Sequence, residues 1–153
     1  MNPEQRLAAA GAFWHEDQAD VEMQHMEAVV TIARRLNFRP KSVHALPVER
    51  RTKLLAQLGD VSDSVATRAL ISYHFTARRD LMAAFLDALG IAHENGLISD
   101  DSVAPPDRAK LLAGIAALRS KFGKSDVDLY LRTLATLDGD TWAELEGALE
   151  SES

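Results

Sequence analysis

Four polar side chains in the first third of the chain are spaced so that one helix would carry them in a single row, at intervals of three, four and three residues. Glu22 and His25 also match the Glu-x-x-His pattern, which is half of the ligand set in di-iron helical bundles. A histidine and an arginine four residues apart lie on the apolar face of another predicted helix. The candidate polar pocket consists of His15, Gln18, Glu22, His25, His74 and Arg78.

Three interpretations of this pocket stay open. Because a buried carboxylate is costly without a partner, the residues can form a structural hydrogen-bond network in which Arg78 pairs with Glu22. They can instead line a pocket that binds a small molecule or performs catalysis. Two histidines and a carboxylate can also hold one metal ion, but the second Glu-x-x-His of a di-iron site is missing and Arg78 would repel a metal. We therefore assign no metal and no cofactor.

Basic residues are concentrated in one segment of an otherwise acidic chain. The net charge is −6, yet residues 34–53 hold seven of the 17 Lys and Arg residues and only one acid. Residues 1–33 and 138–153 each hold six acids. The candidate basic patch consists of Arg34, Arg35, Arg39, Lys41, Arg50, Arg51 and Lys53. It can remain solvated, pair with the protein's own acidic ends, or bind an acidic protein partner or nucleic acid.

Nucleic acid is the least favoured of these partners. Most of an acidic molecule would repel a polyanion, and single strands are bound by stacking of their bases on aromatic side chains. The basic segment holds Phe38 as its one aromatic residue. We therefore expect a protein partner or self-association.

Several classes of enzyme are excluded by what the sequence lacks. It has no cysteine, which excludes thiol nucleophiles and cysteine-ligated metals. It has no phosphate-binding glycine loop, no Gly-x-Ser-x-Gly elbow and no His-Glu-x-x-His motif. We therefore expect a non-enzymatic interaction or scaffold module. The alternative is a helical bundle that binds a small molecule or a metal, or acts as an enzyme, through the polar pocket.

Helices are the elements that would position all these residues. Proline, glycine and capping signals predict helices over about 3–37, 48–58, 62–89, 107–122, 126–137 and 142–150, with a helical turn at 41–45. Asn95-Gly96 predicts a small hairpin in the long connection between the third and fourth. On the first helix, Glu16 falls on the side that faces water, and Met23 and Met26 fall on the apolar side. The fold class is all-α, an antiparallel bundle of about six helices.

The length of 153 residues fits one domain over residues 1–150, with a frayed tail at 151–153. Arg51–Leu58 matches Arg108–Ile115 at five of eight positions. This match is either a chance similarity of common helix formers or an internal duplication, with units at about 14–60 and 63–122. The longest apolar stretch, Leu7–Trp14, is far shorter than the roughly 20 residues of a membrane helix, so we expect a cytoplasmic protein without a membrane partner.

Overall fold

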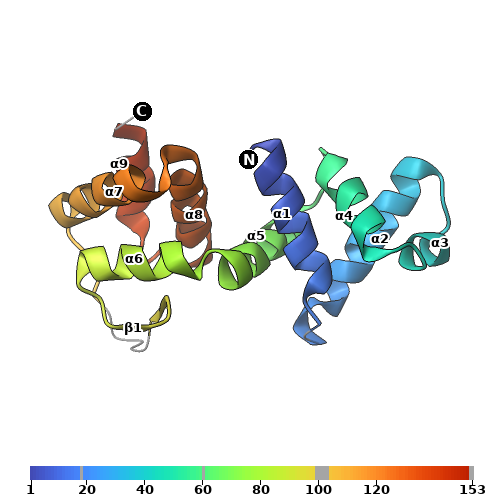
Figure 1. Cartoon of the computed structure of the whole chain (residues 1–153), viewed down its shortest axis with the longest axis horizontal. Helices are drawn as coiled ribbons and strands as arrows, with labels where there is room; N and C mark the ends of the chain where they lie inside the picture. Colours follow the sequence, from blue (N-terminus) through green and yellow to red (C-terminus); the bar gives the residue numbers. More distant parts are fainter. Residues whose placement is uncertain (18, 60, 99–103, 152–153) are drawn as a thin grey trace. The chain divides into compact units, whose positions relative to one another are not determined.

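The computed structural model describes residues 1–17, 19–59, 61–98 and 104–151, and these fold almost entirely into helices (Figure 1). The predicted all-α fold class is confirmed. Contacts among the helices gather into two compact units, Met1–Ala77 (unit 1) and Arg78–Ser153 (unit 2). Among the described helices, none is long and apolar enough to cross a membrane.

Unit 1 is built around α1 and α2. Its elements are α1 (Pro3–His15), the short 3-10 helix η1 (Ala19–Val21), α2 (Glu22–Leu36), α3 (Pro40–His44), α4 (Val48–Gln57) and α5 (Asp63–Ala77). The predicted cap at the start of α1 is present, since the Asn2 side chain accepts a hydrogen bond from the backbone N–H of Gln5. α1 packs against α4 and α5, and α2 packs against α3, α4 and α5. Phe13, Ile32 and Val43 are fully buried in the resulting core.

Unit 2 is built around α7. Its elements are α6 (Arg79–Leu89), a hairpin of β1 (His93–Glu94) and β2 (Leu97–Ile98), α7 (Arg108–Phe122), α8 (Lys124–Leu137) and α9 (Ala143–Ser151). α7 packs against α6, α8 and α9. Phe85, Leu111 and Trp142 lie in the core, and burial raises the pKa of the Tyr130 hydroxyl beside Phe85.

The predicted hairpin is also confirmed in unit 2. Asn95 and Gly96 both adopt left-handed backbone, with φ angles of 51° and 88°, as a tight two-residue turn between strands requires. A Cβ atom at Gly96 would lie 2.8 Å from Cβ of Met82, so the turn also packs closely on α6. Glycine is therefore required at this position for two reasons.

Two helices that the sequence predicts as long and continuous are each divided in the structure. The first ends at His15, because Glu16 adopts extended backbone and its carboxylate contacts α5. The second ends at Ala77, because Arg78 leaves helical geometry with φ −129° and ψ 35°. These divisions and the short helix α3 give nine α-helices in the described part of the chain, where the patterns predict about six. No proline or glycine stands at either break, so tertiary contacts override local helix propensity there.

The domain boundaries that the sequence predicts stay predictions. These are the single domain over residues 1–150 and the repeat units at about 14–60 and 63–122. α9 continues to Ser151, and the rest of the predicted tail, residues 152–153, lies outside the described residues.

Candidate interaction surface

The residues of the candidate polar pocket are divided between the two units. Arg78 belongs to unit 2, where its guanidinium group lies 2.8 Å from a carboxylate oxygen of Asp126 and 3.3 Å from one of Asp80. It also lies over the ring of Phe122. Arg78 is thus paired with acids of its own unit, and the expected pairing with Glu22 stays a prediction. Gln18 lies outside the described residues.

The first two histidines of the pocket are held by backbone carbonyl groups of α1. His15 is exposed and donates a hydrogen bond from Nδ1 to the carbonyl oxygen of Gly11, at 2.8 Å. His25 is half-buried and donates from Nε2 to the carbonyl oxygen of Phe13, at 2.6 Å, with its ring packed on those of Phe13 and Trp14. Glu22 is exposed in the first turn of α2. The predicted row on one helix is wrong, because α1 ends before α2 begins.

His74 is the most deeply buried residue of this set. It lies in α5 with 3% of its surface exposed, and its Nδ1 donates to the carbonyl oxygen of Leu70 at 2.8 Å. The ring also packs edge-on against Tyr73. In the part of the chain that the structure describes, no group of three or more His, Asp or Glu residues is arranged to hold a metal ion. Each of the three histidines therefore donates a hydrogen bond to a backbone carbonyl oxygen, and the pocket stays a prediction.

Within the described part of unit 1, Glu16 rather than Glu22 is the partly buried carboxylate. Glu16, which the helical wheel places toward water, forms an ion pair with Arg68 of α5 and accepts a hydrogen bond from the hydroxyl of Ser72. The side chains of Glu16 and Arg68 are 16% and 20% exposed. Arg68 and Ser72 are four residues apart on α5, so one helix face presents two donors to the same carboxylate. The four-residue spacing of Arg68 and Ser72 is the feature of the sequence that could have indicated their contact with Glu16.

The two methionines predicted on the apolar face of the first helix are exposed, because the helical wheel assumed one unbroken helix. Met23 is 82% exposed and Met26 is 58% exposed. Because α2 is a separate helix, its direction is set independently of α1, and it buries Ala28, Val29 and Ile32 instead.

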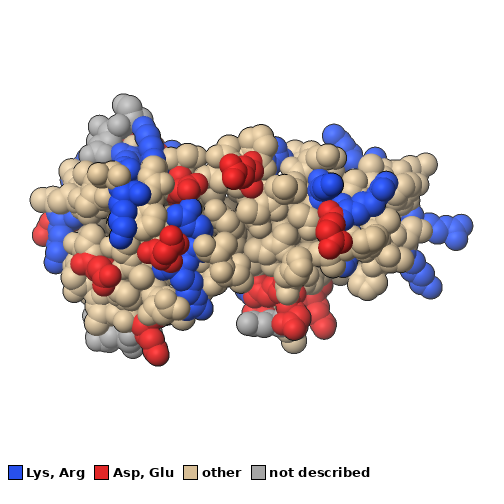
Figure 2. Space-filling model, viewed as in Figure 1, with Lys and Arg blue, Asp and Glu red and all other residues tan. Residues whose placement is uncertain are grey.

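The candidate basic patch lies on three successive helices of unit 1. Its residues come from the last turn of α2 (Arg34, Arg35), the start of α3 (Arg39, Lys41) and α4 (Arg50, Arg51, Lys53). α2 packs against both α3 and α4, so the three helices form one continuous part of unit 1. Figure 2 shows several separate Lys and Arg side chains over this part, with an acidic side chain among them.

Most of these cations form no ion pair within the part of their own unit that the structure describes. The exposed residues Arg34, Arg39, Lys41, Arg50 and Lys53 form no ion pair within the described part of unit 1, and we call them the basic face. Arg51 differs, because its guanidinium group lies 4.9 Å from the centre of the Trp14 ring. The basic face therefore carries a concentrated positive charge toward solvent.

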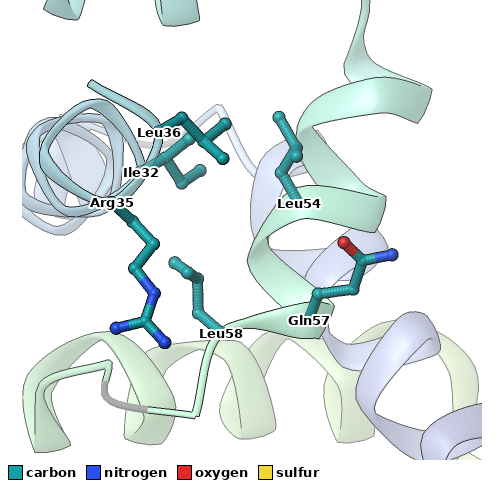
Figure 3. Close-up of a pocket in the computed structure, with 6 residues that line it drawn as sticks. All are labelled: Ile32, Arg35, Leu36, Leu54, Gln57 and Leu58. Atoms are coloured by element: carbon teal, nitrogen blue, oxygen red, sulfur yellow. The ribbon is translucent and has the colours of Figure 1, made fainter. Parts of the chain in front are cut away.

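A cavity of about 210 Å³ lies between α2 and α4 (Figure 3). It is lined by Ile32, Arg35 and Leu36 of α2, by Leu54 and Gln57 of α4, and by Leu58 directly after α4. Figure 3 shows the side chains from α2 on one side of the space and those from α4 on the other. None of these lining residues is a histidine, carboxylate or nucleophile, so the cavity provides apolar contact and one guanidinium group rather than acid–base chemistry.

Comparison with known proteins gave no match among family models, curated proteins or solved structures. The basic face and the cavity share the helices α2 and α4 of unit 1. Together they offer positive charge at long range and an apolar contact at short range. That combination is suited to recognition of a negatively charged partner.

Proposed function

We propose that this protein is a non-enzymatic interaction module that binds an acidic protein partner through the basic face of unit 1. The observation that carries the proposal is the set of five exposed cations without an ion-pair partner in the described part of that unit. Like charges held close together repel one another unless an anion neutralises them. A partner that supplies carboxylates relieves this repulsion and is attracted from a distance.

The lining of the cavity beside the basic face favours this proposal over the alternative of a small-molecule site. Pockets for small molecules and cofactors usually measure roughly 300–1,000 Å³ and hold several polar groups that fix the ligand. The cavity beside the basic face has about 210 Å³ and mostly aliphatic lining, although spaces of about 310 Å³ in unit 1 and 460 Å³ in unit 2 reach that size. The histidines of the candidate polar pocket donate hydrogen bonds to nearby carbonyl groups. The small-molecule alternative therefore has less support than protein binding.

A protein partner is also favoured over nucleic acid. Single-stranded nucleic acid is bound by stacking of its bases on aromatic side chains. Phe38 is the exposed aromatic residue next to the basic face, while Trp14 beneath Arg51 is 7% exposed. A second copy of the chain is one such acidic partner, since residues 138–153 hold six acids and no base. The absence of cysteine fits a cytoplasmic setting, which we include in the proposal.

Binding of labelled poly-L-glutamate, measured by fluorescence anisotropy at low salt, tests the proposal. The triple variant Arg39→Gln/Lys41→Gln/Arg50→Gln should bind about tenfold more weakly than the wild type, because three contributions of roughly 0.5 kcal/mol are lost. The matched control Lys110→Gln/Lys124→Gln/Arg132→Gln removes three exposed cations of unit 2 and should keep wild-type affinity. Added salt should weaken binding by the wild type.

Three results would contradict the proposal. The first is no binding of polyglutamate at low salt. The second is an equal loss of affinity in both triple variants, which would mean that general charge rather than the basic face attracts the polymer. The third is tighter binding of a labelled single-stranded oligonucleotide than of polyglutamate, which would identify nucleic acid as the partner.

A further inference from the structure

We infer that the cavity between α2 and α4 receives one apolar side chain of the acidic partner. The recognised segment is then an acidic peptide in which a single large apolar residue stands between carboxylates. This inference rests on the proposed function, because it specifies the partner of the same face.

The lining and the size of the cavity fit one side chain. Four of the six lining residues are aliphatic: Ile32, Leu36, Leu54 and Leu58. An apolar cavity of about 150 Å³ in another protein holds a benzene molecule. The present cavity has about 210 Å³, which provides room for a ring or a branched aliphatic group but little more. Filling it removes apolar surface from water on both partners.

Cations stand on both sides of this cavity, which places carboxylates on both sides of the apolar residue. On α4, Arg50 precedes Leu54 by four residues, so it lies one turn away on the same row of the helix. Beyond the end of α2, Arg39 of the basic face follows the lining residue Leu36 by three residues and directly precedes α3. A peptide that crosses from α4 to the end of α2 therefore meets positive charge before and after the cavity.

Exposed apolar side chains extend this contact at the end of α2. Leu36, which lines the cavity, is 37% exposed, and Phe38 just beyond it is 47% exposed. An aliphatic cavity is also a poor receptor for a nucleobase, since bases stack on aromatic side chains and none lines this cavity. The same face thus favours an apolar side chain of a peptide over a base.

Two labelled peptides of glutamate and alanine test the inference. They are identical except for one central residue, which is phenylalanine in the first peptide and alanine in the second. The phenylalanine peptide should bind the wild-type protein about tenfold more tightly, because its ring is buried in the cavity. Anisotropy titrations of the full chain with each peptide give the ratio of the two affinities.

Variants that fill the cavity show where the phenylalanine binds. Leu36→Trp places a larger ring in the space and should remove the preference for the phenylalanine peptide. The matched control is Leu137→Trp, because Leu137 also ends a helix, is 46% exposed and lies in unit 2. It should keep the preference. Gln57→Trp, at an exposed lining position on the other side, should act like Leu36→Trp and replaces it if that variant does not fold.

The outcomes separate this inference from the proposed function. Equal affinity of the wild type for both peptides overturns the inference, while salt-sensitive binding of both still supports the basic face. A preference that persists in both filled variants also overturns it, because the side chain then binds elsewhere. Binding of neither peptide, or tighter binding of a single-stranded oligonucleotide, overturns the inference and the proposed function together.

Discussion

Helices α4 and α7 contain matching segments, each with a pair of adjacent leucines, but bury different leucines of the pair. In α4, Leu55 is 6% exposed, while Leu54 lines the cavity beside α2. At the matching positions in α7, Leu111 is 1% exposed and Leu112 is only half-buried. The second leucine of the pair is therefore the more buried one in α4, and the first is the more buried one in α7. The difference teaches that the neighbouring helices decide which leucine is fully buried, and that α4 leaves Leu54 half-buried next to the basic face.

Charges are also treated differently in the two units. In unit 2, Arg119 lies 2.6 Å from Asp128, and Arg108, which matches Arg51 in the sequence, lies 3.9 Å from Glu144. In unit 1, Arg51 lies on Trp14, and the five cations of the basic face have no ion pair within the described part of the unit. Three arginines of unit 2, Arg78, Arg108 and Arg119, have acidic partners, whereas the five cations of the basic face have none within the described part of unit 1.

The largest predicted effect compares the two matching leucines directly. Leu111→Ala removes a fully buried side chain and should lower the free energy of unfolding by about 2–5 kcal/mol. Leu54→Ala removes a side chain that already borders a cavity, so the loss should be about 1 kcal/mol. Urea unfolding followed by circular dichroism measures both values. Equal losses would mean that the two helices bury their leucines alike, which would break the comparison.

The next effect compares two acids of unit 1. Glu16→Ala leaves the partly buried Arg68 without its closest carboxylate and should cost about 1–2 kcal/mol. Glu22→Ala removes an exposed carboxylate at the start of α2 and should cost less than about 0.5 kcal/mol. The same urea titrations measure both changes. A larger loss for Glu22→Ala would restore the predicted polar row and contradict the break between α1 and α2.

Local signals made much of the fold predictable from the sequence. The Asn2 cap with Pro3 and the Asn95-Gly96 turn are fixed by residues next to each other, and the structure confirms them. The breaks after His15 and at Arg78 depend on partners far along the chain, so a helical wheel extended across them misplaced Glu16 and the methionines. The basic patch and the polar pocket were predictable to different degrees for the same reason, because one depends on local sequence and the other on distant contacts.

The basic patch could be listed from the sequence because α2, α3 and α4 follow one another, so a charged segment remains a charged region after folding. The polar pocket required one uninterrupted helix and contacts between distant segments, and neither follows from spacing alone. The cavity was not predicted, because it arises from how closely α2 approaches α4 and which leucine of α4 is covered. Neither quantity is encoded in the local pattern of apolar residues.

The smallest predicted effect concerns the contribution of the basic face to stability. Arg39→Gln/Lys41→Gln/Arg50→Gln should change the free energy of unfolding by less than about 0.5 kcal/mol, since these cations have no ion pair within the described part of unit 1. At low salt the change should be toward greater stability, because repulsion among like charges is relieved. Arg119→Gln, by contrast, leaves Asp128 without its arginine and should cost about 1 kcal/mol. A clear loss of stability in the triple variant would show that these cations support the fold, and the contrast between a paired unit 2 and an available face on unit 1 would fail.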